Sequence, residues 1–369
     1  MKIIIKLQQH WIRFCQWVSR HRKIILIVSS FLVLLIVSAL IFIFVFHGLA
    51  KTKTDPDPDP VLVIVQKKPD PIKYYSPLTG SLVADEVATK QAVTGIMIEN
   101  SPEARPQSGL KNSGVVFEAI CEGGITRFLV LYQSEKPQLV GPVRSVRMYY
   151  IDWASAFDAS IAHVGGNVDA LNEVRNGNHR DIDEFSYADA YWRSDDRYAP
   201  HNMYTSFKDL DALNTEKGYT SSIFTGFSRV DGKPSVTPNA TSINVQISSD
   251  LFNSSYIYDV TTNTYARFQA GEAHLDREDG QITPSVVIAM RVDESTIASE
   301  EGSEESIGTI GTGSVVVFQN GTATEGTWSK ASQTDQIKFT DASGVDIPLI
   351  RGQTWIVALP NSDGIATWQ

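Results

Sequence analysis

The chain has 369 residues, 42% of them hydrophobic, and a formal net charge of −10 at pH 7. This length and apolar content suffice for one or two ordinary cores. Residues 1–23 carry six basic and no acidic residues, so the rest of the chain holds all 42 acidic residues and only 26 basic ones. An acidic body offers little surface for phosphate contacts, which argues against nucleic acid as a partner.

Residues 24–46 form an apolar run in which three serines are the most polar members. About 20 such residues span the hydrocarbon core of a bilayer as a helix. The run is longer than the roughly 7–15 apolar residues of a cleaved signal peptide, and a weak cleavage site follows it. We therefore expect an uncleaved transmembrane anchor. The basic segment 1–23 predicts a cytoplasmic N-terminus, with the bulk of this single-pass cell-membrane protein outside the membrane.

Residues 47–75 read as a stalk. Proline alternates with aspartate from Asp55 to Pro60, a pattern that favours an extended backbone. Residues 61–65 form a short β-like run inside it. On this topology Cys15 and Cys121 lie on opposite sides of the membrane, so they do not pair, and we expect Cys121 to be a small buried residue.

Beyond the stalk the sequence predicts an α+β protein with two regions. Region 76–235 is a mixed α+β domain, with strands expected at 93–98, 115–120 and 128–132 and helices at 148–162, 168–174 and 206–213. Region 236–369 is mainly β, with strands expected at 243–247, 255–258, 265–269, 286–292, 314–318, 321–329 and 354–359. The acidic stretch 293–306 is predicted to be a solvated loop.

Four arginines stand close to the most hydrophobic strands of the first region. They are Arg105, Arg127, Arg144 and Arg147, and the glycine pair Gly123-Gly124 lies among them. A guanidinium grips carboxylate or phosphate through paired hydrogen bonds, and glycine lets backbone N–H groups approach an anion. The pattern predicts an anion-binding pocket. The alternative is internal ion pairing with Glu99, Glu118, Glu122 and Asp152.

Two carboxylates and two histidines are the candidate catalytic groups. Glu118 and Glu122 flank a turn and form a possible acid–base pair of the glycosidase kind, with His163 and His201 assisting. Two glutamates beside a turn are, however, more often structural. No HExxH, CxxC or DxDxDG pattern, phosphate-binding loop or dinucleotide fingerprint occurs, so we expect neither a metal nor a cofactor. The aromatic residues Tyr149, Tyr150 and Trp153 fit core packing better than sugar stacking.

Several short strings carry a resemblance to a known family. In the first region they are Pro77-Leu78-Thr79-Gly80, Arg105-Pro106-Gln107-Ser108-Gly109-Leu110, Glu122-Gly123-Gly124-Ile125-Thr126-Arg127, Gly141-Pro142-Val143-Arg144-Ser145, His163-Val164-Gly165-Gly166 and Pro200-His201-Asn202. In the second they are Tyr258-Asp259, Tyr265, Arg267, Gly311-Thr312-Gly313, Asn320-Gly321, Gly326-Thr327-Trp328 and Gly352-Gln353-Thr354-Trp355-Ile356.

These strings resemble the YerB lipoprotein family, bacterial envelope proteins of unknown function, over roughly residues 76–369. The resemblance implies an extracytoplasmic location and a two-domain plan, but no reaction. The chain departs from the family in its anchor. Members typically carry a lipid-modified cysteine after a signal peptide, whereas here an apolar run stands in its place with no such cysteine.

Our leading hypothesis is a membrane-anchored envelope protein that binds an anionic or glycan-like ligand, such as a cell-wall component. The expected ligand-binding residues are Arg105, Arg127, Arg144, Arg147, Asn100, Gly123, Gly124, His201 and Asn202. One alternative is a wall-polymer hydrolase that uses Glu122 or Glu118 as its acid–base residue. Another is a non-catalytic scaffold for a membrane partner, which needs no pocket.

Overall fold

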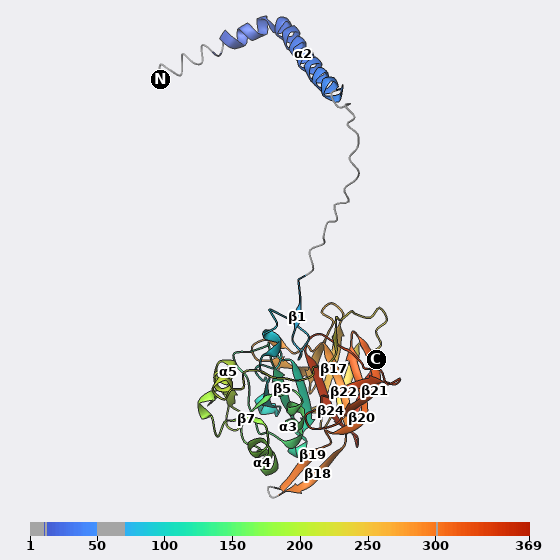
Figure 1. Ribbon diagram of the computed structural model, residues 1–369. Coiled ribbons are helices and arrows are strands. Elements are labelled where there is room, and N and C mark those ends of the chain that lie inside the picture. The colour runs from blue at the N-terminus through green and yellow to red at the C-terminus, as the bar shows by residue number, and fades with distance from the viewer. Residues whose placement is uncertain (1–10, 12, 50–70, 300–301) are drawn as a thin grey trace, which may run out of the picture. The chain divides into compact units, whose positions relative to one another are not determined.

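The structure, a computed structural model, describes residues 11, 13–49, 71–299 and 302–369 (Figure 1). It comprises two compact units, Met1–Asp70 and Pro71–Gln369. In the first unit, α2 (Arg22–Leu49) contains a segment, Arg22–Phe44, that is long and apolar enough to cross a membrane. This segment overlaps the predicted anchor, residues 24–46, over residues 24–44. Most of the predicted stalk, including the β-like run 61–65, lies outside the described residues.

The largest sheet of the second unit has ten strands, in the spatial order β22-β21-β20-β17-β24-β4-β5-β3-β6-β7. In that order the strands span Lys338–Asp341, Thr322–Lys330, Gly311–Gln319, Val286–Val292, Thr354–Pro360, Val115–Ile120, Thr126–Tyr132, Thr94–Glu99, Ser160–His163 and Arg180–Asp183. β24 pairs in parallel with both β17 and β4, whereas β4, β5 and β3 are antiparallel neighbours.

A second sheet has five strands in the order β14-β13-β12-β11-β25, which span Glu272–Ala273, Thr264–Gln269, Ser254–Asp259, Ser242–Gln246 and Ile365–Trp368. The remaining strands form two-stranded pairs: β1 (Tyr74–Tyr75) with β2 (Leu82–Val83), β8 (Tyr191–Arg193) with β9 (Met203–Thr205), β10 (Arg229–Val230) with β23 (Leu349–Ile350), β15 (Leu275–Asp276) with β16 (Gly280–Gln281), and β18 (Glu294–Ser299) with β19 (Gly302–Ile307).

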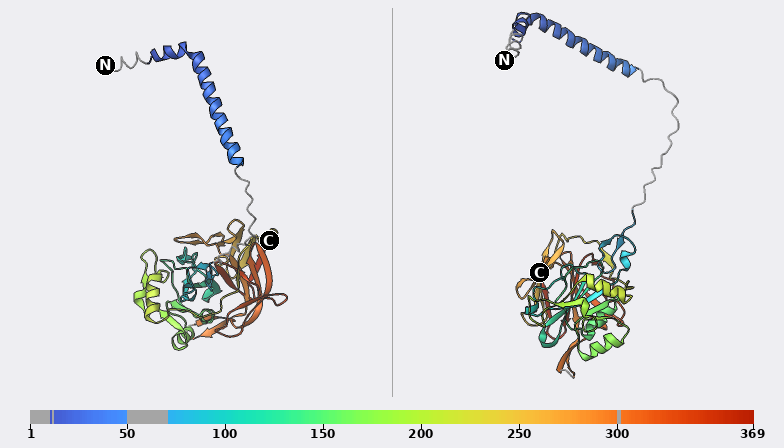
Figure 2. Two further views of the ribbon diagram at one scale, coloured as in Figure 1. Left: turned by 45° about the horizontal axis from the view of Figure 1, so that its top comes forward. Right: turned by 90° about the vertical axis from the view of Figure 1, so that its left-hand side faces the viewer.

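The helices of this unit all come from its N-terminal half. They are α3 (Met148–Ser155), α4 (Val168–Asn176) and α5 (Phe207–Glu216), with short 3-10 turns η1 (Ala88–Lys90), η2 (Pro102–Ala104), η3 (Glu122–Gly124) and η4 (Ala188–Ala190). Figure 2 shows the green and yellow-green helices gathered on one side and the orange and red strands on the other. The α+β class predicted from the sequence is therefore confirmed, with a mainly β C-terminal part.

The central strands β24, β4, β5 and β3 of the ten-stranded sheet are buried on both faces, which explains why these strands are apolar along most of their length. Along β4, Val115, Phe117 and Ala119 belong to one hydrophobic core, whereas Val116 and Ile120 belong to the other. Successive side chains of a strand point to opposite faces, so only a sheet covered on both sides needs apolar residues at every position.

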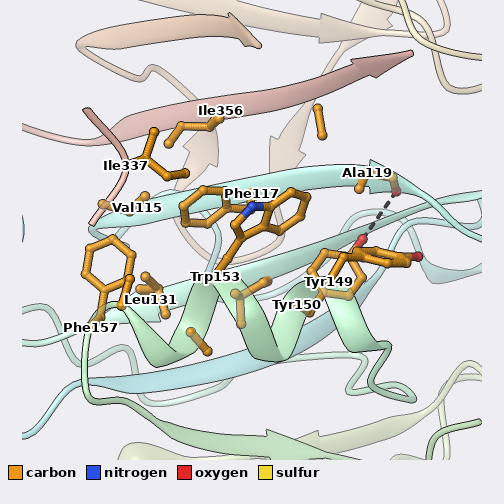
Figure 3. Close-up of a cluster of buried hydrophobic side chains, with 14 of the residues drawn as sticks. Val115, Phe117, Ala119, Leu131, Tyr149, Tyr150, Trp153, Phe157, Ile337 and Ile356 are labelled. Atoms are coloured by element: carbon orange, nitrogen blue, oxygen red, sulfur yellow. Dashed lines mark hydrogen bonds between the residues drawn. The ribbon is translucent and has the colours of Figure 1, made fainter. Parts of the chain in front are cut away.

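Helix α3 covers the first face (Figure 3). Trp153 stacks on Phe117 with ring centroids 5.0 Å apart and an interplanar angle of 11°. The Tyr150 hydroxyl donates to the Ala119 carbonyl at 3.2 Å, which ties the helix to β4. These aromatic residues are therefore core residues, as the sequence favoured. The same core encloses Cys121, which is buried as expected.

The five-stranded sheet contributes to the core on the second face. Ile243 and Tyr256 from this sheet join Phe128 and Trp355 from the large sheet in one cluster. Tyr256 and Trp355 are fully buried. Because β24 lies beside β4, strands from both predicted regions share one sheet and one compact unit. The boundary at residue 235 stays a prediction.

Two predicted elements differ from the structure. The helix expected over 148–162 ends at Ser155, the chain turns at Asp158 with a φ of 49°, and Ser160–His163 forms the inner strand β6. A short apolar run is ambiguous between helix and strand, and pairing with β3 decides this one. The loop expected over 293–306 is instead largely the hairpin β18–β19, in which six antiparallel residue pairs form, among them Ser295 with Ser306 and Thr296 with Glu305.

Candidate functional site

Glu99, the last residue of β3, lies at the centre of the candidate site. It is only 4% exposed. Its Oε1 atom accepts hydrogen bonds from His201 Nδ1 at 2.9 Å and Ser101 Oγ at 3.1 Å. The Nε atom of Arg144 lies 3.4 Å from the same oxygen. One oxygen of the Glu99 carboxylate is therefore in contact with an arginine, a histidine and a serine, which come from three segments of the chain.

Arg144 is held by the backbone on both sides. Its N–H donates to the Met97 carbonyl of β3, and its own carbonyl accepts from the N–H of Val164. Gly141 precedes it with a φ of 152°, at a point where a Cβ would lie 2.7 Å from the Tyr204 ring. The tight approach of this segment to β9 therefore requires glycine.

The guanidinium of Arg144 has spare binding capacity. Its side chain is 26% exposed, and among the described residues neither Nη atom has a hydrogen-bond partner. Burial, together with repulsion from Arg127, Arg147 and Arg193, lowers the pKa of Arg144 despite the attraction of Glu99. Arg144 is therefore a partly buried cation with one carboxylate neighbour and three arginines close enough to repel it.

Arg127 and Arg147 lie close enough to Arg144 to lower its pKa. Arg127 is the cross-strand partner of Glu99, and its Nη1 donates to the Ser145 carbonyl at 2.7 Å. Arg147 makes two hydrogen bonds to the Glu122 carboxylate, at 2.5 and 2.7 Å. Burial lowers the pKa of Arg147, but the hydrogen bonds that Arg147 donates to Glu122, together with nearby negative charge, outweigh burial and raise this pKa overall. Arg147 is thus held by two hydrogen bonds to its carboxylate, whereas Arg144 has only the longer 3.4 Å contact with Glu99.

Glu122 owes its position to the turn between β4 and β5. Gly123 and Gly124 have φ values of 70° and 72°, a left-handed conformation that glycine adopts without strain. Burial raises the pKa of Glu122, but the hydrogen bonds from Arg147 outweigh it, and the pKa is lowered overall. The two glycines therefore allow the tight turn that carries Glu122, the partner of Arg147.

The loop 194–202 brings His201 to the site and holds a fourth arginine, Arg193, at the end of β8. The Asn202 side chain donates to the carbonyls of Ser194 and Arg197, which closes the loop, and it accepts from Arg193 Nη1 at 2.9 Å. All the polar atoms of the Asn202 side chain are therefore used within the protein. Asn202 positions Arg193 and the neighbouring His201.

Arg105 lies apart from the other three predicted arginines. Its guanidinium donates to Asn100 and to the Leu251 carbonyl, and it lies 5.3 Å from the centre of the Phe252 ring. Burial and repulsion from Arg267 lower the pKa of Arg105 to about 10. Asn100 is fully buried and also accepts from Gln107. The structure thus places Arg105 and Asn100 in a polar network toward the second sheet.

Glu118 lies deeper in the same network. It is fully buried and accepts hydrogen bonds from Arg267 and from the Trp355 indole, both at 2.8 Å. Arg267 also donates to His274, which contacts Gln107. Burial, then the charge of Arg267, lowers the pKa of His274 well below its usual range. Glu118 therefore joins the two predicted regions and has no access to a polymer ligand.

His163 is also enclosed. It is fully buried, and its ring nitrogens lie 3.0 Å from Asp181 Oδ1 and 2.8 Å from the Gly165 carbonyl. These contacts fix the turn after β6 whose backbone supports Arg144. The described residues contain no group of three or more His, Cys, Asp or Glu side chains suited to a metal ion.

The structure therefore brings together Arg127, Arg144, Arg147 and His201, and it separates Arg105, Glu118 and His163 from them. Sequence reasoning did not include Arg193 or Ser101. No sequence signal links Arg193 to Asn202 across the intervening loop. Two cavities, of about 530 and 580 Å³, lie elsewhere, beside η4 and α5 and beside β20 and β21. Neither is lined by a candidate residue.

Comparison with known proteins places the chain in a family. Two family descriptions match, "Protein of unknown function (DUF3048) N-terminal domain" over residues 78–220 and its C-terminal domain over residues 243–356. The "Putative lipoprotein YerB" of Bacillus subtilis is 32% identical over 304 residues, which cover 79% of this chain and 88% of that protein. The crystal structure of the Bacillus subtilis YerB protein matches with a TM-score of 0.71 and 28% identity, over 80% of this chain and all of that one. These matches confirm the resemblance of the sequence strings, and the chain belongs to the YerB-like DUF3048 family, whose function is unknown.

Proposed function

We propose that this protein is anchored in the cell membrane and binds an anionic ligand of the cell envelope through an arginine cluster. We define this cluster as Arg127, Arg144, Arg147 and Arg193. The apolar helix α2 and the lipoprotein description of the Bacillus subtilis relative support membrane association.

The single observation that carries the proposal is the state of Arg144. Its guanidinium is partly exposed, its Nη atoms have no partner among the described residues, and three further arginines lie close enough to lower its pKa. An arginine fork of this kind matches a carboxylate or phosphate through two parallel hydrogen bonds. A bound anion would relieve the repulsion among the four guanidinium groups.

The anchor fixes where such a ligand lies. We place residues 1–23 in the cytoplasm, because this segment carries six basic and no acidic residues, and residues 47–369 outside the membrane. The anchor is then uncleaved and crosses the membrane once. Envelope polymers that carry carboxylates or phosphates are the anionic ligands within reach.

Retention on isolated wall material tests the proposal. The full chain in detergent micelles is retained, and Arg144→Gln reduces its affinity by about tenfold or more, since a charge-assisted pair is lost. Lys208→Gln removes one positive charge from an exposed position on α5 and leaves retention unchanged. Equal retention of both variants and the wild type contradicts the proposal and favours the scaffold alternative.

The hydrolase alternative lacks comparable support. A general acid needs a carboxyl group that is protonated and accessible near its working pH. Glu118 is fully buried in an ion pair, and the pKa of Glu122 is lowered through its two bonds to Arg147. Release of soluble wall fragments by the wild type, and its loss in Glu122→Gln, is the result that would favour hydrolysis.

A further inference from the structure

The second oxygen of Glu99 is an unusual feature of the site. Oε1 serves Arg144, His201 and Ser101, whereas Oε2 is shielded from solvent and has no hydrogen-bond partner among the described residues. The Glu99 side chain is 6% exposed. Buried carboxylate oxygens are normally satisfied, because leaving one unpaired costs free energy.

The chemistry of Glu99 Oε2 and its neighbours limits which kind of ligand group can form a hydrogen bond with this oxygen. A carboxylate oxygen accepts hydrogen bonds, so the missing group is a donor. The Arg144 Nε atom, beside Oε1, is likewise buried without a well-formed hydrogen bond. Within the described part of the chain, the site thus holds an unpaired acceptor, Glu99 Oε2, close to the guanidinium of Arg144, which makes no well-formed hydrogen bond. Oε1 of the same carboxylate is the atom that contacts Arg144.

We propose that the ligand of the arginine cluster carries a hydroxyl group close to its anionic group, as in a polyol phosphate or a hydroxy acid. The anion binds the Arg144 fork and the hydroxyl donates to Glu99 Oε2. This inference rests on the proposed anion-binding function and specifies the chemistry of its ligand.

Access to Oε2 requires a small rearrangement. The side chains of Arg144 and His201, which converge on Glu99, are 26% and 25% exposed, so each has room to rotate toward solvent. Ser101 remains bound to Oε1 and keeps the carboxylate oriented. Binding therefore replaces part of the Arg144–Glu99 contact with contacts to the ligand.

Three matched probes test this inference by equilibrium dialysis with the full chain in detergent micelles. Propyl phosphate supplies the anion alone, glycerol 1-phosphate adds hydroxyls, and 2,3-dimethoxypropyl phosphate keeps the oxygens without O–H donors. The wild type prefers glycerol 1-phosphate to both others by about tenfold, the value of one hydrogen bond to a charged acceptor. Glycerate against propionate repeats the comparison for a carboxylate and shows which anion the site prefers.

Glu99→Gln is the decisive variant. Its amide oxygen keeps the contacts with Arg144 and His201, so an N–H donor replaces Oε2. The variant should bind glycerol 1-phosphate and the dimethoxy probe equally, while the exposed control Glu103→Gln keeps the wild-type preference. Arg144→Gln should weaken all three probes.

The two hypotheses fail differently. Equal binding of the three phosphates by the wild type, abolished by Arg144→Gln, overturns the hydroxyl inference and leaves the arginine proposal standing. An unchanged preference in Glu99→Gln also overturns the inference. No binding of any probe, phosphate or carboxylate, overturns both.

Discussion

At the scale of single residues, neighbouring positions of β3 and its following loop serve different faces of the molecule. Glu99 faces the arginine cluster, whereas Asn100 binds Arg105 and Gln107 in the buried network. The alternation of side chains at the end of a strand separates these two polar systems. Sequence proximity alone placed both sets of residues in one expected pocket.

The sequence predicted the chemistry of these residues better than their grouping. Internal ion pairing with a set of carboxylates that included Glu99 and Glu122 was the alternative to ligand binding, and in the structure Arg144 pairs with Glu99 and Arg147 with Glu122. The pairing of Glu118 with Arg267 spans 149 positions. Contacts at such separations depend on how the two sheets pack, which no local pattern encodes.

The buried pair of Glu118 and Arg267 gives a stability prediction. Both side chains are fully buried, so neutralising one leaves the other charge uncompensated. Glu118→Gln should lower the free energy of unfolding by about 3 kcal/mol, measured by chemical denaturation. The double variant Glu118→Gln/Arg267→Met should lose less than the sum of the single changes. Additive losses would show that the pair is not coupled.

At the scale of elements, buried strands were the most predictable features. β4 and β17 begin and end where the sequence predicted, because their runs of apolar residues are bounded by turns. The β18–β19 hairpin was missed, because its acidic composition resembles a solvated loop. Two of its acidic side chains are accommodated by hydrogen bonds, since Glu304 accepts from Asn167 and Glu305 accepts from Thr296.

That hairpin should respond to pH through Glu294. Burial, and then repulsion from Glu305 and Asp363, raises the pKa of Glu294 to about 7. The folded state therefore binds this proton more tightly than the unfolded chain, whose ordinary value is 4.5. Its stabilising contribution is complete below pH 4.5 and is lost as the pH rises through about 7.

Thermal unfolding measures this effect. Between pH 5 and pH 8, Glu294→Gln should show a smaller fall in melting temperature than the wild type, because the variant cannot lose the proton. The exposed control Glu325→Gln should behave like the wild type. Parallel pH profiles for the wild type and Glu294→Gln would refute the assignment.

At the scale of the whole molecule, the two halves matched by the family descriptions are physically interdependent. β24, from the C-terminal half, lies between β17 and β4, and its Trp355 donates to Glu118 of the N-terminal half. Glu118 in turn accepts from Arg267 of the second sheet. The composition change near residue 236 predicted a mainly β half correctly, but this sharing of one sheet had no sequence signature.

The proposed topology makes a prediction for the full chain in its membrane. A protease added outside intact cells should remove residues beyond 46, whereas a tag placed before residue 1 should remain protected, since basic segments are retained in the cytoplasm. Immunoblots of both ends provide the measurement. Protection of residues 71–369 would contradict the proposed orientation.

The most direct test of anion binding observes Arg144 itself. In the full chain labelled with 15N-arginine, the Arg144 Nε–H resonance, assigned by its loss in Arg144→Gln, should shift saturably on titration with propyl phosphate. The Arg105 resonance should not shift, because its guanidinium is engaged with Asn100 and Leu251. A site at Arg144 predicts this selective response. An unchanged Arg144 resonance across the titration would contradict the central claim.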